Sequence, residues 1–482
     1  MMMSSFTLAE LAQAISAVVH LNDTAADVAE NISAQRINTD TRNLKQGDVF
    51  LALRGEHFDG HDYLQTALDS GAAAAIIDET YFKGLLSEEA ANTVSALPLL
   101  IVKDTLQALG QASLWNRQKF SGPLVAITGS AGKTSVKSMT SHILTLLGDC
   151  WATPGNFNNH IGAPLTLLGL APQHKAAVIE LGASSEGEIA YTSQWAKPDV
   201  AIITNVSGAH LEEFGSIETI MRTKGEIIDA LSLDGCAVLN ADDFYYADWV
   251  LRAGKRKVLS FGISNYADVM AQNIVCDEYG SCFDLVYQEQ RIPTEIPLLG
   301  QHNVANALSA IAAGLALGLD VKDVLAQLKN LPVVDGRLQW VEGDNDIRIL
   351  NDSYNASPAS VKAAIDVLAL WKDDAWLVLG DMAELGDSAA AIHAEMGAYA
   401  QQQGIAHFVA TGADCRHAVA AFKQTRDAHW FETQHELLQF IKQNKQPGQV
   451  FLVKGSRSAG MDKVVTALSK STAADHIHKE EV

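Results

Sequence analysis

A phosphate-loop pattern lies between a strand and a helix in the first third of the chain. The apolar run LVAIT (124–128) predicts a buried strand, GSAGKT (129–134) follows it, and the next residues repeat apolar side chains at helical spacing. Glycines let backbone N–H groups turn toward an anion, and a helix N-terminus favours phosphate. The usual loop, G-x-x-x-x-G-K-[ST], would place a glycine where this chain has Ile127. The pattern therefore predicts an α/β fold with a shortened nucleotide loop.

The loop supplies the first candidate site residues. In such a loop the lysine contacts the β- and γ-phosphates and the next hydroxyl binds Mg²⁺, which are the positions of Lys133 and Thr134. The alternative is a glycine-rich turn with an incidental lysine. The residues that we expect to contact ATP here are Thr128, Gly129, Ser130, Ala131, Gly132, Lys133, Thr134 and Ser135.

Strand-like and helical segments alternate over most of the chain. AAVIEL (176–181) and VAIITNV (200–206) read as buried parallel strands, and IRILNDS, WLVLGDM, HFVATG and VFLVKGS form a second set after residue 331. The helix after the loop is expected to place four side chains on one buried face, namely Val136, Met139, Ile143 and Leu147. The predicted fold class is α/β with three domains: a small N-terminal α/β domain (1–102), a central P-loop parallel-sheet ATPase domain (103–330) and a C-terminal Rossmann-like α/β domain (331–482).

The composition excludes several classes of function. The formal net charge is −22, which argues against nucleic acid and anionic membranes as partners. The five cysteines are scattered without a C-x-x-C pair, so we expect reduced thiols. The first residues lack a basic and an apolar signal region, and the apolar stretch 304–319 is too short to span a bilayer. We expect a cytoplasmic protein without membrane insertion.

Two polar residues follow predicted strands of the central domain. Glu180 ends one strand and His210 lies shortly after another, at the edge where open α/β sheets bind ligands. A carboxylate there suits a nucleotide-bound Mg²⁺. Either residue could instead be an ordinary polar group at a loop edge.

Lys224 is a further candidate. Its sequence context first suggests a solvated helical lysine, and the functional alternative is a buried amine of lowered pKa that forms a carbamate with CO₂.

Further candidates lie nearer the C-terminus. Asn303 and Asn306 are three residues apart and share a helical face; Asn303 could be a simple cap, whereas Asn306 is harder to explain that way. Arg337 is a candidate for phosphate contact. Asp352 ends a predicted strand before a turn rich in Asn, Ser and Pro, which could also be only a well-formed loop.

Taken in order along the chain, the motifs resemble those of the Mur ligase family of ATP-dependent amide-forming enzymes. They are TGSAGKTS, TPGNFNNHIGAPLTLL, IELGAS, TNVSGAHLEEFGS, KGEI, GQHNVANALSA, GRL and DSYNASP. The resemblance covers essentially the whole chain. It implies that the N-terminal domain binds a UDP-linked substrate, the central domain binds ATP and Mg²⁺, and the C-terminal domain binds the incoming dipeptide and closes on ATP.

The resemblance also implies roles for single residues. Those implied to be catalytic are Lys133, Glu180, His210 and Lys224, and those at the metal are Thr134, Glu180, His210 and Lys224 as its carbamate. The ATP site would be completed by Asn303, Asn306, Arg337 and Asp352, and the UDP-linked substrate would meet Thr41, Arg42, Asn158 and Asn159. His160 and Ser184-Ser185 depart from the family pattern, which leaves the substrate contacts of these loops less secure than the ATP site.

Within the family, the segments 38–64, NDSYNASPAS, LGDMAELGDSA and VKGSRSAGMDKVV are most similar to the dipeptide-adding branch. This implies a monomeric enzyme that joins D-Ala-D-Ala to UDP-N-acetylmuramoyl-tripeptide through an acyl phosphate, releasing ADP and phosphate, in peptidoglycan precursor synthesis. The alternatives are a diamino-acid-adding relative or a folylpolyglutamate-synthase relative. From other classes, a P-loop kinase or ATPase and a nucleotide-sensing binding module also stay open.

Overall fold

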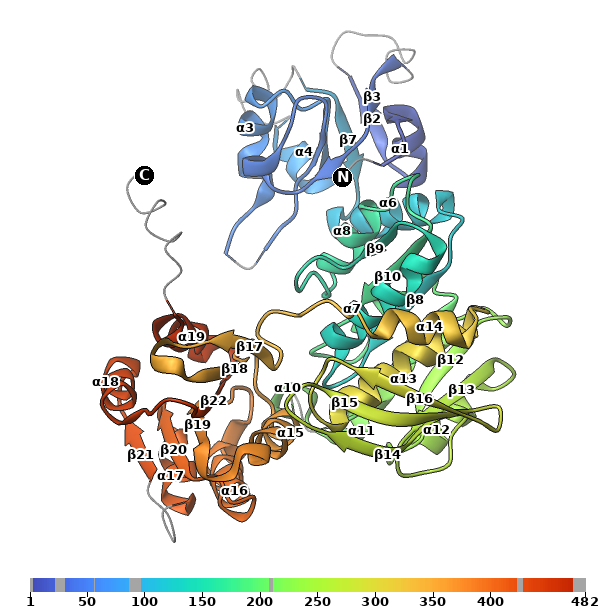
Figure 1. Ribbon diagram of the computed structural model, residues 1–482. Helices are drawn as coiled ribbons and strands as arrows, with labels where there is room; N and C mark the ends of the chain where they lie inside the picture. Colours follow the sequence, from blue (N-terminus) through green and yellow to red (C-terminus); the bar gives the residue numbers. More distant parts are fainter. Residues whose placement is uncertain are drawn as a thin grey trace.

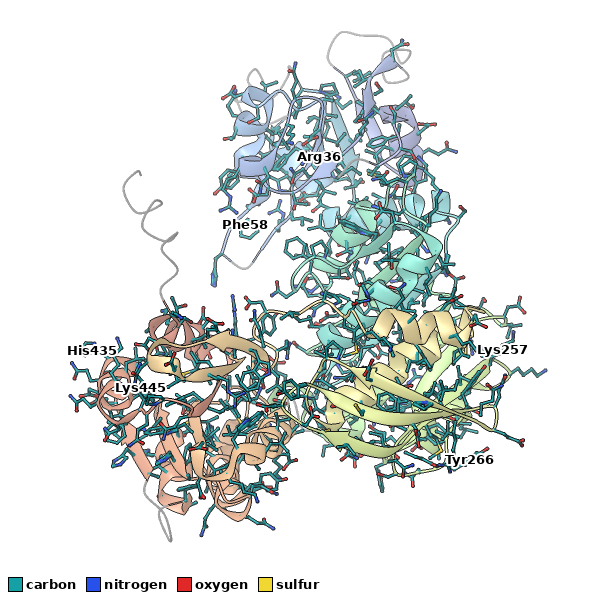
Figure 2. All side chains as sticks on the ribbon, viewed as in Figure 1. Arg36, Phe58, Lys257, Tyr266, His435 and Lys445 are labelled. Carbon is teal, nitrogen blue, oxygen red and sulfur yellow. The ribbon has the colours of Figure 1, made fainter. Side chains whose placement is uncertain are left out.

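Three sheets follow one another along the chain. The computed structural model describes residues 3–21, 31–55, 57–85, 97–207, 211–422 and 428–470. In Figure 1 the blue N-terminal domain lies above the green and yellow central domain, and the orange C-terminal domain lies beside the central one. Figure 2 adds the side chains and labels Arg36, Lys257 and Lys445, one in each domain. The fold is therefore a three-domain α/β architecture.

The N-terminal domain is built on a five-stranded sheet of order β2-β7-β6-β5-β4, in which only β2 runs antiparallel to its neighbour. Thr7 and Glu10 form a capping box that starts α1. The elements are β1 (Phe6–Thr7), α1 (Leu8–Ala14), β2 (Val18–His20), β3 (Ser33–Ala34), β4 (Ile37–Asn38), η1 (Thr41–Asn43), β5 (Val49–Leu51), η2 (Gly60–Tyr63), α3 (Leu64–Asp69), β6 (Ala74–Asp78), α4 (Glu79–Leu85) and β7 (Leu99–Val102).

The central domain carries a nine-stranded sheet of order β16-β15-β14-β13-β12-β11-β8-β10-β9. The seven strands from β14 to β9 run parallel to one another. The strands are β8 (Leu124–Thr128), β9 (Cys150–Ala152), β10 (Ala176–Glu180), β11 (Val200–Ile203), β12 (Cys236–Asn240), β13 (Lys257–Gly262), β14 (Val269–Cys276), β15 (Ser281–Tyr287) and β16 (Gln290–Ile296). The helices are α6 (Thr105–Lys119), α7 (Lys133–Leu144), η3 (Thr145–Leu147), α8 (Gly162–Leu168), α9 (Glu188–Ala196), α10 (Leu211–Phe214), α11 (Ile217–Asp229), α12 (Tyr246–Ala253), α13 (Gln301–Ala316) and α14 (Val321–Leu328).

The central sheet was predicted to be parallel, but one of its edges is antiparallel. β15 pairs antiparallel with both β14 and β16, so a meander extends the parallel part. These strands alternate buried and exposed side chains, as expected for a sheet with one wet face, whereas the parallel strands are continuously apolar. The apolar runs therefore predicted β8, β10 and β11 at the centre of the sheet, but they did not predict β9, β12, β13, β14 or the meander.

Helices α7 and α13 pack against the parallel strands in one apolar core. Val136, Met139 and Ile143 of α7 are buried there, as predicted. The prediction was wrong for Leu147, which is 38% exposed. The α-helix ends at Leu144 and continues as a 3₁₀ turn, which has three residues per turn and rotates Leu147 away from the core face.

The C-terminal domain has a six-stranded sheet of order β17-β18-β22-β19-β20-β21, parallel except for the edge strand β17. Its elements are β17 (Gln339–Glu342), η4 (Asp344–Asp346), β18 (Arg348–Asp352), α15 (Pro358–Leu368), η5 (Ala369–Asp374), β19 (Ala375–Gly380), η6 (Gly386–Ser388), α16 (Ala389–Gln402), β20 (His407–Thr411), α17 (Cys415–Phe422), β21 (Ala428–Phe431), α18 (Gln434–Asn444), β22 (Val450–Lys454), η7 (Arg457–Ala459) and α19 (Asp462–Leu468). The last strand, β22, lies between β18 and β19, so three loops that are distant in sequence leave neighbouring strands.

The domain boundaries after residues 102 and 330 remain predictions. Each of them lies between two sheets in the chain. Helix α6 follows the first of them and contributes Ala108, Leu109 and Ala112 to the core of the N-terminal domain. Among the described residues, no helix is long and apolar enough to cross a membrane.

Candidate active site

The phosphate loop is held in place from the end of β11. Gly129 has a φ of 146° and a Cβ there would lie 1.9 Å from Thr204 Oγ1, so this position requires glycine. Thr204 Oγ1 donates to the carbonyl of Ala131 at 2.6 Å, and the Ala131 N–H donates to Asn205 Oδ1 at 3.0 Å. The sequence did not indicate Thr204 and Asn205, because both fell inside the run predicted as a strand (200–206), whereas β11 ends at Ile203 and leaves them in the loop.

Lys133 begins α7 and lies across the loop. Its Nζ donates to the carbonyl of Gly129 at 2.7 Å and approaches that of Ser130 at 3.4 Å. Burial lowers the pKa of Lys133, and Glu180 opposes that shift while Arg337 adds to it. Gly132, the N-cap, has a φ of 84° and no room for a side chain beside Asn306. Lys133 and the N-terminus of α7 thus border the same loop, where a phosphate would be favoured.

Glu180, at the end of β10, is the centre of a buried polar cluster. Its Oε1 accepts from Asn158 Nδ2 at 2.8 Å and lies 3.4 Å from Thr134 Oγ1. Its Oε2 lies 3.2 Å from Lys137 Nζ, an ion pair without hydrogen-bond geometry. Lys137 also donates to the carbonyl of Gly155 at 3.0 Å. The sequence analysis missed Lys137, whose helical position resembles that of any exposed lysine.

The oxygens of this cluster fit a magnesium ion. Thr134 Oγ1 and the carboxylate of Glu180 are hard ligands that lie side by side at the N-terminus of α7. Glu180 Oε2 is buried and has no hydrogen-bond partner among the described residues, so it keeps acceptor capacity. His210, the other predicted metal residue, lies outside the described residues.

Lys224 lies on α11 and is 3% exposed, so it is not the solvated lysine that its sequence first suggested. Its Nζ is 3.4 Å from the carbonyl of Ala183 and 5.3 Å from the ring centre of Phe214. Burial lowers its pKa to about 7, Lys133 adds to the shift, and Glu188 and Glu226 oppose it. Much of this lysine is therefore a neutral amine at neutral pH, the form that reacts with CO₂.

A cavity of about 310 Å³ lies between the phosphate loop, α13 and the C-terminal domain. Asn306 Nδ2 donates to Asn303 Oδ1 at 3.2 Å, and Asn303 Nδ2 donates to the carbonyl of Leu299 at 2.9 Å. The capping alternative for Asn303 was wrong: its amide donates to a preceding carbonyl, and Gly300 is the N-cap. Both asparagines are nine-tenths or more buried and line the cavity.

The C-terminal domain closes this cavity with a buried ion pair. Lys454 Nζ lies 2.5 Å from Asp352 Oδ2 and donates to the carbonyl of Asn355 at 2.9 Å. His302 of α13 faces the pair, and burial lowers its pKa to about 4, so it is neutral. Arg337 completes the wall; its Nε is buried without a hydrogen-bond partner among the described residues. His302 and Lys454 were not found from the sequence.

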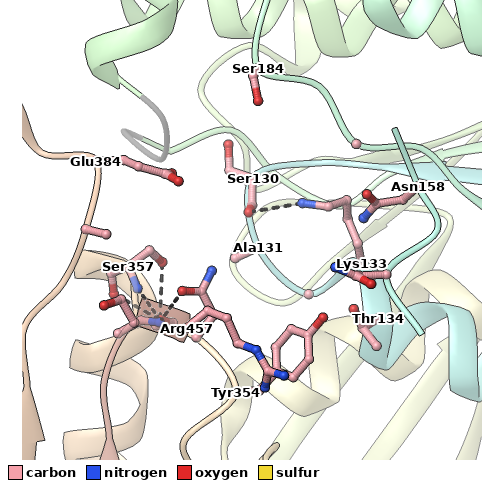
Figure 3. Close-up of a pocket in the computed structure, with 18 of the residues that line it drawn as sticks. Ser130, Ala131, Lys133, Thr134, Asn158, Ser184, Tyr354, Ser357, Glu384 and Arg457 are labelled. Carbon is pink, nitrogen blue, oxygen red and sulfur yellow. Dashed lines mark hydrogen bonds between the residues drawn. The ribbon is translucent and has the colours of Figure 1, made fainter. Parts of the chain in front are cut away.

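A larger cavity of about 810 Å³ joins the phosphate loop to the C-terminal domain (Figure 3). The central wall includes Lys133, Thr134, Asn158, Asn159 and Glu180. Asn159 Oδ1 also accepts from the N–H of Gly162 at 2.7 Å, at the start of α8. The opposite wall is made by the loops that follow β18, β19 and β22, the start of α15, and Arg337 ahead of β17.

The predicted contacts for the UDP-linked substrate fall in two places. Asn158 and Asn159 line the larger cavity, whereas Thr41 and Arg42 lie in η1 of the N-terminal domain and line neither of the cavities described above. Arg42 pairs with Asp40 at 2.9 Å, and its side chain is 87% exposed. Of the residues that depart from the family pattern, Ser184 lines the larger cavity, and its N–H donates to Glu188 Oε2 at 2.8 Å.

The sequence of this chain is similar to those of known proteins. The chain matches the Mur ligase middle domain over residues 127–314, the Mur ligase glutamate ligase domain over 336–457 and the Mur ligase family catalytic domain over 33–113. It is 39% identical to the UDP-N-acetylmuramoyl-tripeptide–D-alanyl-D-alanine ligase of Escherichia coli K12, over 92% of this chain and 95% of that protein. The ligase of the same name from Bacillus subtilis is 36% identical over 90% of this chain and 93% of its own.

Solved structures show a similarity to the same group of ligases. A crystal structure of MurF from Acinetobacter baumannii superposes with a TM-score of 0.87 at 33% identity, covering 96% of this chain and 98% of that one. MurF from Thermotoga maritima in complex with ADP gives 0.79 at 27% identity, covering 90% of this chain and 96% of the other. On the domains matched and the length of the relatives covered, the chain belongs to the Mur ligase family.

Proposed function

We propose that this chain is the ATP-dependent ligase that joins D-Ala-D-Ala to the terminal carboxylate of UDP-N-acetylmuramoyl-tripeptide, in cytoplasmic peptidoglycan precursor synthesis and as a monomer. The observation that carries the proposal is the larger cavity. It places the phosphate loop and Glu180 opposite a second wall from another domain. A kinase needs room for one acceptor, whereas a ligase must bring a carboxylate, ATP and an amine together. The names of the relatives supply the identity of the substrates.

The reaction has two steps, and the residues present fit both. The γ-phosphoryl group of ATP passes to the carboxylate oxygen, which gives an acyl phosphate and ADP. The amine then attacks the acyl carbon; a C–N bond forms, the C–O bond to phosphate breaks, and a proton is released. Most of the protein's work is positioning and charge neutralisation. Lys133 and the N-terminus of α7 face the phosphates in this proposal.

Magnesium and nucleoside would occupy adjoining sites. Thr134 and Glu180 would hold Mg²⁺, together with His210 and the carbamate of Lys224, and the ion would neutralise phosphate charge. Asn303, Asn306, Asp352 and Arg337 would bind the nucleoside side of ATP in the smaller cavity. Asn158, Asn159, Thr41 and Arg42 would contact the UDP-linked substrate.

The test is ADP release from the purified chain. We expect release only when ATP, UDP-N-acetylmuramoyl-tripeptide and D-Ala-D-Ala are all present, with free phosphate formed in equal amount. A phosphorylated product that persists would indicate a kinase. Turnover with a diamino acid and the UDP-linked dipeptide instead would indicate the diamino-acid-adding branch. Lys133→Ala should abolish turnover, and normal activity of that variant would remove the phosphate-loop assignment.

A further inference from the structure

The turn from residue 182 to residue 188 forms part of the central wall of the larger cavity. Its cavity-lining residues are Gly182, Ala183, Ser184 and Glu188. Figure 3 shows Ser184 projecting from this turn toward the phosphate loop. The carbonyl of Ala183 also lies 3.4 Å from Lys224 Nζ. The position of the turn therefore sets how the cavity wall meets Lys224.

Helix α9 begins directly after this turn, and its N-cap residue cannot cap it with a side chain. That residue is Gly187, whose φ of 90° favours glycine. The first N–H groups of a helix need acceptors, and the side chain of an N-cap serine or aspartate usually supplies one. In this helix the acceptors must come from another part of the fold.

Glu226 of α11 supplies two of these acceptors. Its Oε1 accepts from the N–H of Gly187 at 2.9 Å, and its Oε2 accepts from the N–H of Ala190 at 2.8 Å. Ala190 is the third residue of α9, so one carboxylate makes the two contacts that a capping box makes with two side chains. Its negative charge also suits a helix N-terminus. Glu226 is 9% exposed, so both hydrogen bonds are largely shielded from water.

Glu226 and Lys224 are two positions apart on α11. Glu226 contacts the C-terminal end of the 182–188 turn, and Lys224 contacts Ala183 near its start. Helix α11 therefore meets the turn at both ends. The contact of Glu226 is the stronger one, because a carboxylate that accepts two backbone N–H groups forms charge-assisted hydrogen bonds.

A further link between α11 and the turn lies at the surface. Arg222 Nε is 3.4 Å from Glu186 Oε1, and both side chains are about half exposed. Exposed ion pairs contribute little because water and salt screen them. The same turn thus has a buried link and an exposed link to the same helix, and the two can be removed separately.

We propose that Glu226 is a positioning residue, which fixes the 182–188 turn against α11 so that the cavity wall and Lys224 keep one spacing. This inference rests on the function proposed above, in which Lys224 belongs to the magnesium site. Glu226 lines neither the larger nor the smaller cavity, so it acts through the turn and not by contact with a substrate. A displacement of about 1 Å at a reacting group can lower a rate by about 100-fold.

A double-mutant cycle tests this link. Glu226→Gln keeps the size of the side chain, but its amide oxygen can serve only one of the two N–H positions while its NH₂ group faces the other. We expect kcat to fall about 10- to 100-fold, with the KM for ATP within about threefold. In a Lys224→Ala background the same change should cost less than about threefold, because its effect passes through Lys224.

The proposal fails if Glu226→Gln lowers kcat by the same factor in both backgrounds, since Glu226 would then only support the fold. Should the glutamine variant not fold, the cycle is carried out with Glu226→Asp, and the same criterion applies. Aspartate keeps the charge but is one methylene shorter, so it cannot reach both N–H groups in the present geometry.

Arg117 provides the control for the stability of α9. At the other end of this helix its guanidinium donates to the carbonyls of Ala196 at 2.9 Å and Lys197 at 3.1 Å. The helix has 9 residues, which places these contacts about 13 Å from Gly187. Both Arg117→Gln and Glu226→Gln should lower hydrogen-exchange protection in α9 by about 10-fold or more. Only Glu226→Gln should lower kcat by more than about threefold, and an equal loss in Arg117→Gln would overturn the proposal.

Arg222→Gln is the control for the exposed link and should keep kcat within about twofold. A loss as large as that of Glu226→Gln would remove the distinction between the two links and with it the assignment to Glu226. If the unmodified enzyme releases ADP without needing both substrates, the proposed function fails. If release needs both substrates but the cycle is additive, only the positioning role of Glu226 fails.

Discussion

Lys224 in the central domain and Lys454 in the C-terminal domain are both almost completely buried, with 3% and 1% exposure. Lys454 meets the carboxylate of Asp352 at 2.5 Å. Lys224 meets the carbonyl of Ala183 at 3.4 Å and the ring of Phe214. Burial lowers the pKa of both, but Asp352 opposes the shift of Lys454 directly. Lys454, which is paired, holds two strands together as a cation, whereas Lys224 has no carboxylate at ion-pair distance among the described residues and is available as a neutral amine.

The largest effect is expected where the pair of Lys454 is broken. Asp352→Asn leaves the ammonium of Lys454 buried beside a neutral amide, and removing one partner of a buried ion pair typically costs about 3–5 kcal/mol. Because the chain has several domains, hydrogen exchange in β18 and β22 is the appropriate measurement, and we expect their opening free energy to fall by about that amount.

The double variant Asp352→Asn/Lys454→Met is the control for that experiment. Methionine removes the charge and keeps much of the side-chain volume, so protection of β18 and β22 should largely return. If the single variant keeps full protection, Lys454 does not need its partner and the contrast with Lys224 loses its physical basis.

The second prediction concerns Lys224. Lys224→Ala should lower kcat by about 10²–10³-fold, the range for removing one group that stabilises charge in the transition state. Short carboxylates such as acetate should restore part of that activity if the lysine acts as a carbamate. Lys224→Arg keeps a cation that cannot form a carbamate, so it should stay inactive. An active arginine variant, or no rescue of the alanine variant, would return Lys224 to an ordinary buried cation.

The contrast between the two lysines also shows what sequence reasoning can reach. The position of Glu180 at the end of a strand, and of Asn303 and Asn306 on one helical face, follow from local periodicity, and the structure places all three in the cavities. Burial of Lys224 does not follow from its own helix, because neighbours such as Ala183 and Phe214 cover it.

Residues that meet across a long stretch of sequence were missed for the same reason. Lys454 is 102 positions from Asp352 in the chain, and no spacing rule links the two. Arg457 and Glu384 meet one cavity only because β22 inserts between β18 and β19. The order of the strands, which the motifs did not specify, decides which loops become neighbours.

The third prediction uses His302, which faces the Lys454 pair from the central domain. Burial lowers its pKa to about 4, while Asp352 and Asp366 oppose the shift and Lys454 adds to it. The unfolded chain, with a histidine pKa near 6.5, therefore binds the extra proton between these values, and stability falls as the pH drops from about 6.5 to about 4. His302→Gln should remove about 2 kcal/mol of that loss between pH 7 and pH 5. Hydrogen exchange in α13 at pH 7 and pH 5 measures it, and equal pH dependence in both proteins would contradict the assignment.

The smallest effect is expected at a third buried lysine, Lys137, which resembles Lys454 in being paired. It links Glu180 to the carbonyl of Gly155, while Asn158 of the same loop donates to Glu180. Binding of the UDP-linked substrate to this loop should therefore tighten binding of ATP with Mg²⁺, by the same factor in both directions. We expect Lys137→Met to reduce this coupling by about 5- to 20-fold, and Lys137→Arg to keep most of it. Calorimetry of nucleotide binding with and without the UDP-linked substrate measures the coupling. If the coupling in Lys137→Met equals that of the unmodified protein, Lys137 does not transmit the effect of substrate binding to Glu180.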